Sequence, residues 1–222
     1  MKLAVIIPVY NAENTIRKAV KSIDTTHDVE IICINDGSTD RTKQVLTELQ
    51  KEVKHLIVYH QDNQGAAKSR NMGLSAMSDD IDAFMFLDAD DQFLPGKMDQ
   101  MIQYYEKNEH LDIVIGQIGR GLNGDWKVIP THEDIHREAI VSLAEAPEIL
   151  QSIGPGGKLF KAKFNTLRFD EDVVFCEEHT FVTRAYLMAR DIQLVPFIVY
   201  GYNNREGSIT DQRADTFISY LE

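Results

Sequence analysis

Three carboxylates directly follow a short apolar run, and no other feature of the sequence is better suited to chemistry. The apolar run ends at Leu87, and the acidic residues lie in the motif Asp88-Ala89-Asp90-Asp91. Carboxylates crowded at a strand end repel one another, and a hard divalent cation offsets that repulsion. A metal-dependent site is one hypothesis. The other is an acidic turn that caps a following helix, and the motif alone favours neither.

Three further polar clusters follow apolar runs in the first half of the chain. They are Pro8-Val9-Tyr10-Asn11, residues 35–40, and residues 65–73, the last of which contains Lys68 and Arg70. Taken alone, each cluster is also explained by turn and helix-cap chemistry, or by a solvated helix face for the two basic residues.

Short apolar runs alternate with longer amphipathic stretches, which is the rhythm of βαβ units. The runs predict strands at 3–9, 30–34, 56–59 and 84–87, with helices around 16–23 and 45–49, at 65–76 and at 96–108. After a strand at 113–118, the pattern predicts a hairpin or irregular loop at 119–133, a turn at 154–157, a helix at 178–190 and a strand at 192–200. We therefore expect an α/β fold with ligand-binding loops at the carboxyl ends of the strands.

The composition limits the classes of partner. With 222 residues and 43% hydrophobic content, the chain can bury one sizeable core, so we expect a single domain over residues 1–222. A net charge of -12 is the opposite of the basic surface that nucleic acid requires, so nucleic acid is not an expected partner. A small phosphorylated ligand can still bind where a cation and local Arg or Lys side chains neutralise its phosphates.

Nothing in the sequence requires an oxidising compartment or a membrane span. The two cysteines lack the spacing of a disulfide framework, and the apolar run at 3–9 is short and contains Pro8. We expect a cytoplasmic protein without a transmembrane segment, and leave peripheral membrane contact and oligomeric state open. The apolar spacing at 217–221 is typical of an unfinished amphipathic helix, so we expect the natural chain to continue past Glu222.

In this order and at this spacing, the four clusters resemble the inverting glycosyltransferases of family 2. The resemblance is specific from Leu3 to about Tyr105. It implies the GT-A fold, a Rossmann-like three-layer α/β/α domain with a mixed, mainly parallel central sheet. Residues 1–105 would form the nucleotide-sugar-binding half of the catalytic domain, and residues 106–222 the acceptor-side half.

The resemblance implies roles for residues of the first half. Asp36 would accept a hydrogen bond from the imide N–H of a uracil ring. Pro8 and Tyr10 would pack the base and ribose, with Asn11 beside them. From the third cluster, Lys68 and Arg70 would bind the nucleotide-sugar, Arg70 as a fixed charge and hydrogen-bond donor.

The same resemblance assigns the carboxylate motif to metal and donor binding. Asp88 would contact the ribose or the metal and its waters, Ala89 would line the donor site, and Asp90 would ligate a Mn²⁺ or Mg²⁺ that bridges the diphosphate. That cation would act as a Lewis acid for the leaving UDP. Asp91 would orient its neighbours.

The second half carries weaker motifs. Lys158-Leu159-Phe160-Lys161 resembles a strand that lines the acceptor side in the family. Glu178 occupies the position of the catalytic base, where the family usually has Asp. The alternative is that acids in the first turn of a helix only complement its dipole. A late loop containing Arg205 and Ser208 would reach the diphosphate.

These observations predict a metal-dependent inverting glycosyltransferase that moves a sugar from a UDP-sugar to a hydroxyl of a cell-surface polymer or glycan. The second half is most similar to bacterial enzymes of wall teichoic acid and capsular polysaccharide synthesis, so a polyol-phosphate polymer is one expected acceptor. Two alternatives remain. One is a nucleotidyltransferase, which would normally have a glycine-rich loop where this chain has Pro8–Asn11. The other is a nucleotide-sugar-binding module without turnover.

Overall fold

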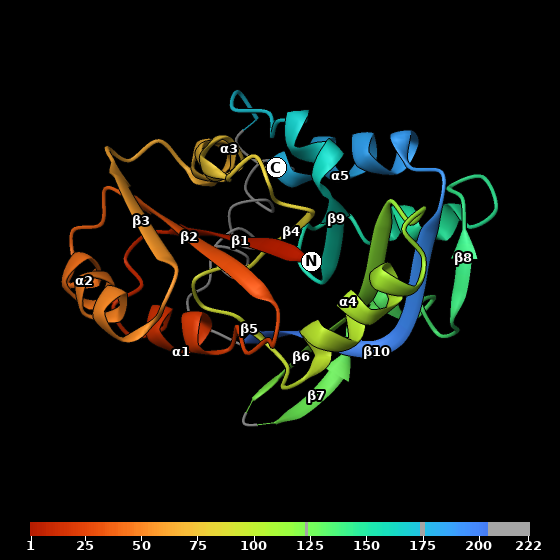
Figure 1. Ribbon diagram of the computed structural model, residues 1–222, viewed down its shortest axis with the longest axis horizontal. Coiled ribbons are helices and arrows are strands. Elements are labelled where there is room, and N and C mark those ends of the chain that lie inside the picture. The colour runs from red at the N-terminus through yellow and green to blue at the C-terminus, as the bar shows by residue number, and fades with distance from the viewer. Residues whose placement is uncertain (123, 174–175, 204–222) are drawn as a thin grey trace, which may run out of the picture.

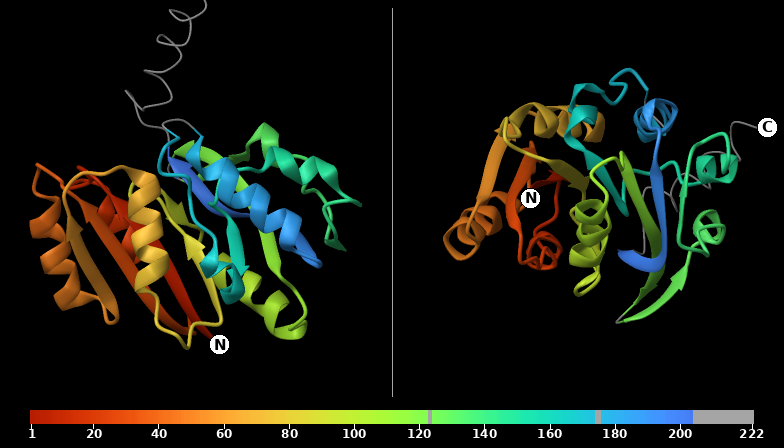
Figure 2. Two further views of the ribbon diagram at one scale, coloured as in Figure 1. Left: turned by 90° about the horizontal axis from the view of Figure 1, so that it is seen from above. Right: turned by 45° about the vertical axis from the view of Figure 1, so that its right-hand side comes forward.

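One mixed sheet runs through the molecule and carries helices on both faces (Figure 1). The structure is a computed structural model that describes residues 1–122, 124–173 and 176–203. Within these residues the strand order is β3-β2-β1-β4-β9-β6-β10-β5, with β7 paired to β6 and β8 paired to β10. The right-hand view of Figure 2 shows α3 and α5 (gold and blue) on one side of the sheet and α1, α2 and α4 (red, orange and yellow-green) on the other.

The first half of the chain supplies parallel strands whose carboxyl ends meet at one edge of the sheet. Strand β1 pairs in parallel with β2 and β4, and β2 pairs in parallel with β3. The elements are β1 (Lys2–Val9), α1 (Ile16–Lys21), β2 (Asp28–Asp36), α2 (Thr42–Glu52), β3 (Leu56–Gln61), α3 (Ala66–Ala76) and β4 (Ala83–Phe86). Gly73 lets α3 lie close to β1, because a Cβ there would be 2.3 Å from Cγ2 of Ile6.

The second half extends the sheet with both strand directions. Strand β9 is antiparallel to β4 and β6, and β6 is parallel to β10. The strands are β5 (Gln92–Phe93), β6 (Ile113–Leu122), β7 (Asp125–Val128), β8 (Ala139–Val141), β9 (Lys158–Lys161) and β10 (Ile192–Asn203). The α-helices are α4 (Lys97–Lys107) and α5 (Glu177–Met188), and short 3₁₀ helices occupy Pro130–His132, Pro147–Gln151 and Ala162–Thr166.

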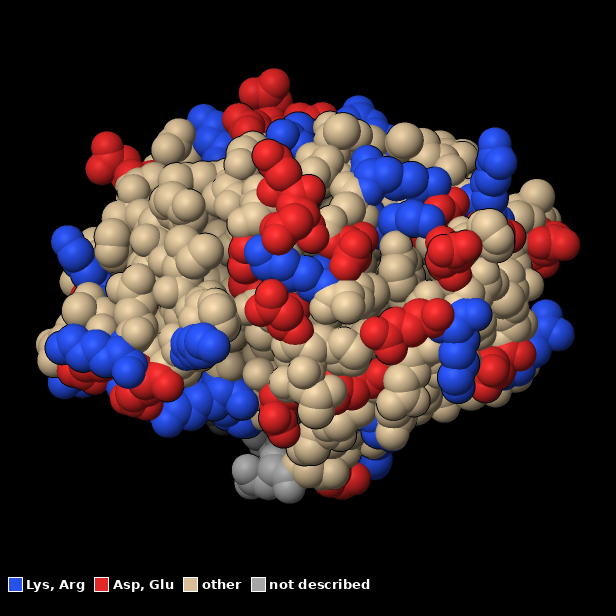
Figure 3. Space-filling view, in the orientation of Figure 1, with Lys and Arg blue, Asp and Glu red and all other residues tan. Residues whose placement is uncertain are grey.

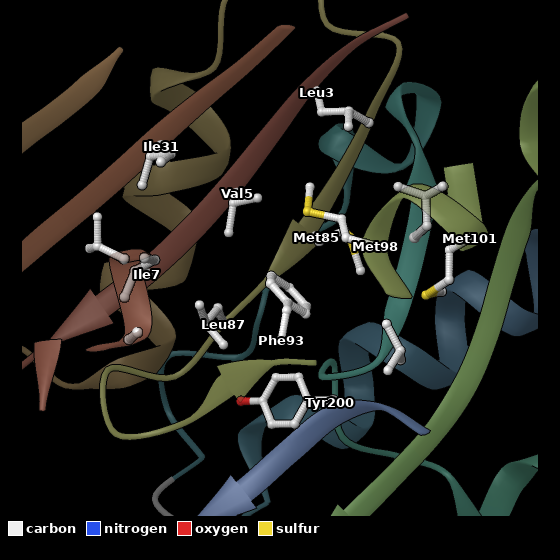
Figure 4. Close-up of a cluster of buried hydrophobic side chains, with 14 of the residues drawn as sticks. Leu3, Val5, Ile7, Ile31, Met85, Leu87, Phe93, Met98, Met101 and Tyr200 are labelled. Atoms are coloured by element: carbon white, nitrogen blue, oxygen red, sulfur yellow. The ribbon is translucent and has the colours of Figure 1, made fainter. Parts of the chain in front are cut away.

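Each face of the sheet has its own hydrophobic core. Alternate residues of β1 point to opposite faces, so Leu3, Val5 and Ile7 pack in one core and Ala4 and Ile6 in the other. Figure 4 shows the first core, in which side chains of β1 and β4 meet side chains of α4 and β10. The second core lies under α3 and α5 and contains a cluster of aromatic rings: Phe84, Phe86, Phe160, Phe169 and Phe181.

The predicted fold class is confirmed. The sheet is mixed, its three longest strand pairings are parallel, and helices cover both faces. The hairpin expected at 119–133 is formed by β6 and β7, whereas the short strands β5 and β8 were not predicted. The helix expected at 217–221 lies outside the described residues. No helix in the described part of the chain combines the length and apolar character needed to cross a membrane.

Charges of both signs are intermixed on the face that carries the N-terminus (Figure 3). There the Lys2 ammonium lies 2.8 Å from carboxylate oxygens of both Glu30 and Asp80. This face holds the amino end of β1, so it is opposite the edge at which β1, β2 and β4 end.

Candidate active site at the carboxyl ends of the strands

Two loops at the carboxyl ends of β1 and β2 are tied together by hydrogen bonds. The backbone N–H of Asn11 donates to Ser38 Oγ (3.0 Å), and the Asn11 side-chain oxygen accepts from the Thr39 N–H (2.8 Å). Asn11 has φ 47°, a left-handed conformation that asparagine tolerates. Asn11 therefore fixes the loop, while the neighbouring Tyr10 ring is 51% exposed and Pro8 is half-buried within β1.

Asp36 is buried at the end of β2 and holds the loop that precedes α3. Its Oδ1 accepts from Gln61 Nε2 (2.7 Å) and from the backbone N–H of Gln64 (2.8 Å), and its Oδ2 accepts from the N–H of Gly65 (2.8 Å). An ionised carboxylate offers about four acceptor positions, so roughly one remains for a ligand. The sequence did not indicate this structural role, and the contact with a uracil ring stays a prediction.

Arg70 and Asp88, which are predicted to act on the same ligand, form an ion pair. Arg70 Nη2 lies 2.9 Å from Asp88 Oδ1, and the guanidinium lies 5.4 Å from the centre of the Phe169 ring. The Arg70 side chain is 7% exposed and that of Asp88 is 41% exposed. Lys68 is half-buried two residues before Arg70 in α3, with its ammonium 3.5 Å from Gln64 Oε1. The ion pair leaves the Asp88 carboxylate within reach of solvent.

Strand β10 holds the turn formed by residues 88–91, which we call the carboxylate turn. The Tyr200 hydroxyl accepts from the Asp88 N–H (3.1 Å) and donates to Asp91 Oδ2 (2.8 Å). The Asn203 N–H donates to Asp91 Oδ1 (3.0 Å), and its side-chain amide donates to the Asp90 carbonyl (2.6 Å). Burial and the charges of Asp88 and Asp90 raise the pKa of Asp91 to about 8. Strand β10 thus holds the Asp91 carboxylate, and the role of Asp91 in orienting its neighbours stays a prediction.

The helix-cap explanation of the motif is wrong. Strand β5 and the residues after it separate the motif from α4, whose N-cap is Gly96 and has no side-chain cap hydrogen bond. Tyr200 and Asn203 were not identified in the sequence. The available signal was a tyrosine at the end of an apolar strand, because a buried Tyr hydroxyl usually needs a hydrogen-bond partner.

The carboxylates fit a cation whose coordination a ligand completes. In the described residues, no group of three or more His, Cys, Asp or Glu side chains could hold a metal alone. Mg²⁺ is usually held by one or two carboxylates together with phosphate oxygens of the substrate, rather than by an all-protein cage. Asp88 and Asp90 are half-buried, with the buried Ala89 between them. Their carboxylates can supply those one or two hard oxygen ligands.

An open groove of about 690 Å³ lies between α3, the segment 168–171 and α5. The Asn71 side chain joins two of these elements, because its amide donates to the Phe169 carbonyl (3.0 Å) and its oxygen accepts from the Phe169 N–H (2.8 Å). The charged residues of the lining are Lys68, Arg168, Asp170, Glu171 and Arg184. The groove therefore adjoins the Arg70–Asp88 pair through Phe169.

Of the residues predicted in the second half, Glu178 is half-buried in the first turn of α5 and is not in the groove lining. Asp170 and Glu171 are in that lining. Arg205 and Ser208 lie outside the described residues.

Lys158, expected in a strand that lines the acceptor side, points into the interior. Its ammonium is fully buried and donates to Ser152 Oγ (2.8 Å) and to the Gly154 carbonyl (2.5 Å). Burial lowers the pKa of Lys158 to about 7. Ser152 Oγ also lies 2.9 Å from His132 Nε2. Burial, and to a smaller extent the charge of Lys158, lowers the pKa of His132 to about 3. This network supports the 154–157 turn, and its burial keeps a substrate away from the lysine and serine.

Comparisons with known proteins place the chain in a family. The profile of the family "Glycosyl transferase family 2" matches residues 4–175. A putative glycosyltransferase, TagX, from Staphylococcus aureus (strain N315) is 36% identical over 219 residues, which are 97% of this chain and 62% of the relative. A poly(ribitol-phosphate) beta-glucosyltransferase from Bacillus spizizenii is 28% identical over 213 residues, covering 91% of this chain and 32% of that protein.

Among solved structures, S. aureus TarS 1-349 in complex with UDP-GlcNAc has a TM-score of 0.82 at 24% identity, covering 95% of this chain and 61% of that one. This likeness supports the fold. The chain spans about 62% of the length of the TagX relative. On the match of the family profile and the identity to TagX, the chain belongs to glycosyl transferase family 2.

Proposed function

We propose that the chain transfers a sugar from a UDP-sugar to a hydroxyl group of a cell-surface polymer. The observation that carries the proposal is the convergence of Tyr10, Arg70 and the carboxylate turn at the edge where β1, β2 and β4 end. UDP is the proposed nucleotide because the TarS structure of the same fold was solved with UDP-GlcNAc.

The donor would bind with its base beside Tyr10 and its diphosphate at the carboxylate turn. The half-exposed Tyr10 ring offers a flat surface for the base. The remaining acceptor position of Asp36 would take the imide N–H, and the Arg70 guanidinium would hold Asp88 in place. Outside the described residues, Arg205 and Ser208 belong to the proposal as further diphosphate contacts.

Asp90, with Asp88, would hold the Mn²⁺ or Mg²⁺ that family resemblance implies. When bound, such a cation supplies a Lewis acid that offsets charge on the leaving diphosphate. The chain's own contribution is an ordered turn, since Tyr200 and Asn203 hold the backbone of the motif through contacts within the protein. Preorganised groups lose less entropy on binding than mobile ones.

Glu178 is the proposed general base, which removes a proton from the acceptor hydroxyl as the oxygen attacks the anomeric carbon. The assignment rests on the family resemblance of the motif that ends at Glu178, which the structure has in the first turn of α5. Glu171 is the second candidate, since it lines the groove and lies 2.9 Å from the Asn71 amide.

The acceptor would be a glycan or a polyol-phosphate polymer. A relative with 28% identity is named a poly(ribitol-phosphate) beta-glucosyltransferase. The groove beside Phe169 offers three cations and several amides, a combination that suits a ligand with phosphates and hydroxyls.

Isothermal titration with UDP, CDP and a panel of UDP-sugars, each with and without Mn²⁺, tests the proposal together with an assay for transfer. We expect UDP and one UDP-sugar to bind only with the cation, and transfer to follow. Cation-dependent binding without transfer or donor hydrolysis would instead support a binding module. Absence of nucleotide binding under all conditions would contradict the proposal.

A further inference from the structure

Trp126 is the only tryptophan of the chain, and it lies outside both hydrophobic cores. It sits in β7 and is half-buried. Within the described residues, the indole is neither a member of a core nor packed against one, and its N–H has no hydrogen-bond acceptor.

Glycines on neighbouring strands accommodate the ring. A Cβ on Gly201 of β10 would lie 2.6, 2.8 and 2.9 Å from three adjacent carbons of the six-membered ring. These nearly equal distances show that Gly201 faces the flat side of the indole, because an approach to the ring edge would bring one carbon much closer than its neighbours. A Cβ on Gly119 of β6 would lie 3.1 Å from Trp126 Cβ. One face of the ring therefore rests on backbone, and any larger residue at Gly201 would displace it.

The indole lies on the same side of the sheet as α5. Ile113 and Ile115 of β6 belong to the core under α3 and α5. Gly121 is an even number of residues further along β6, so it faces the same side of the sheet. Trp126 is the register partner of Gly121, and paired residues of neighbouring strands share a face. Glu178 is in the first turn of α5.

The ring also lies close to the carboxylate turn. Gly201, on which it rests, precedes Asn203 by two residues, or roughly 7 Å along a strand, so Gly201 and Asn203 share a face of β10. Tyr200 and Asn203 are the residues that hold the turn. The indole thus adjoins the proposed donor site.

We propose that Trp126 is a carbohydrate-binding residue of the active site, which stacks the C–H face of a sugar or polyol on the ring face away from Gly201. This inference rests on the proposed function. An aromatic ring offers a large, rigid contact surface, and the indole N–H can donate to a hydroxyl of the same ligand. The ligand comes from the sugar of the donor or from the acceptor, and its chemistry is the same in both cases.

Intrinsic fluorescence tests the inference directly, since all tryptophan emission of the 222 residues comes from position 126. The protein would be titrated with UDP, with UDP-GlcNAc and with a poly(ribitol phosphate) oligomer, each with Mn²⁺, while calorimetry measures binding. We expect UDP-GlcNAc or the oligomer to change the emission well beyond any effect of UDP. The ligand that does so shows whether the stacked sugar or polyol comes from the donor or from the acceptor. Binding of both by calorimetry with no change in emission beyond that of UDP would overturn the inference. Absence of all binding would overturn the proposed function on which it rests.

A variant gives a second test. Trp126→Leu should raise the KM for the stacked substrate by about three- to tenfold and leave kcat and the affinity for UDP unchanged. Val128→Ala, which shortens a half-buried side chain of the same strand, is the control for damage to the hairpin. Equal KM values for Trp126→Leu and the parent would contradict the inference, as would equal losses in the two variants.

Discussion

The strand ends of the first half and the elements α5 and β10 of the second half both contribute to the candidate site, but they are built in different ways. In the first half, the residues proposed to face the ligand come at or just after the ends of their strands, as Tyr10 follows β1 and Asp88 follows β4 by two residues. In the second half, the residues that hold the site reach it across long sequence distances: Tyr200 is 112 residues from Asp88. Short motifs therefore specify the donor side, and tertiary packing specifies the rest.

Glu178→Gln tests this difference and has the largest expected effect. Glu178 belongs to α5 in the second half of the chain and is the proposed general base. Turnover should fall by roughly 10² to 10⁴, the usual contribution of a general base, while UDP and Mn²⁺ binding persist. Glu177→Gln, one position away in the same turn, is the matched control. Normal transfer by Glu178→Gln would remove it from the mechanism, and a dead Glu171→Gln variant would then identify the base in the groove lining.

The buried Lys158 should make stability rise with pH, which is opposite to the effect of Asp91, whose pKa of about 8 lowers the free energy of unfolding as the pH rises toward that value. The pKa of Lys158 is about 7 in the folded protein against an ordinary value of 10.5, so the unfolded chain binds more protons between these values. The free energy of unfolding therefore rises with pH above about 7, by at most about 1.4 kcal/mol per pH unit. Urea unfolding at pH 9 and pH 10, where Asp91 is ionised in the folded and unfolded states, measures this slope.

Lys158→Met removes the titrating group and should flatten that slope, whereas Lys161→Met, a half-buried neighbour in β9, should keep it. An identical slope in the parent and in Lys158→Met would show that the ammonium is not the cause.

Asp36 shows that the donor side also has residues with a structural task. Asp36→Ala should lower the free energy of unfolding by about 2 to 4 kcal/mol, because it leaves the N–H groups of Gln64 and Gly65 without their acceptor. It should also narrow the preference for UDP over CDP, if the remaining acceptor position contacts the base. Thermal unfolding and nucleotide titration separate the two effects. Full stability would contradict the anchoring role, and an unchanged nucleotide preference would move base recognition elsewhere.

The fold and half of the site follow from the sequence because their signals are local. The apolar runs and turn residues of 3–105 predict the parallel strands and place the polar clusters at their ends. The contacts of Asn203 with Asp90 and Asp91 and the inward direction of Lys158 were not predictable. They depend on the register of β10 and on a turn wrapped around an ammonium, and neither leaves a periodic pattern.

Tyr200→Phe tests the link between the two regions with the smallest expected effect. It keeps the ring that packs against Phe93 and loses only the hydroxyl that joins the Asp88 N–H to Asp91. Cation-dependent UDP affinity should fall by about tenfold, the cost of roughly one hydrogen bond to a charged group. Tyr104→Phe, whose hydroxyl contacts only Glu138 in the described residues, is the control. Equal UDP affinity in Tyr200→Phe and the parent would mean that the motif orients itself without β10.

The most direct test of the central claim is the affinity for UDP, with and without Mn²⁺, of the parent and of Asp90→Asn. Asp125→Asn makes the same charge change on an exposed residue and serves as the control. We predict that Mn²⁺ strengthens UDP binding in the parent and in Asp125→Asn, and that Asp90→Asn loses this enhancement because it lacks the charged oxygen ligand facing the diphosphate. Binding of UDP to Asp90→Asn in Mn²⁺ as tight as that of the parent would contradict the account.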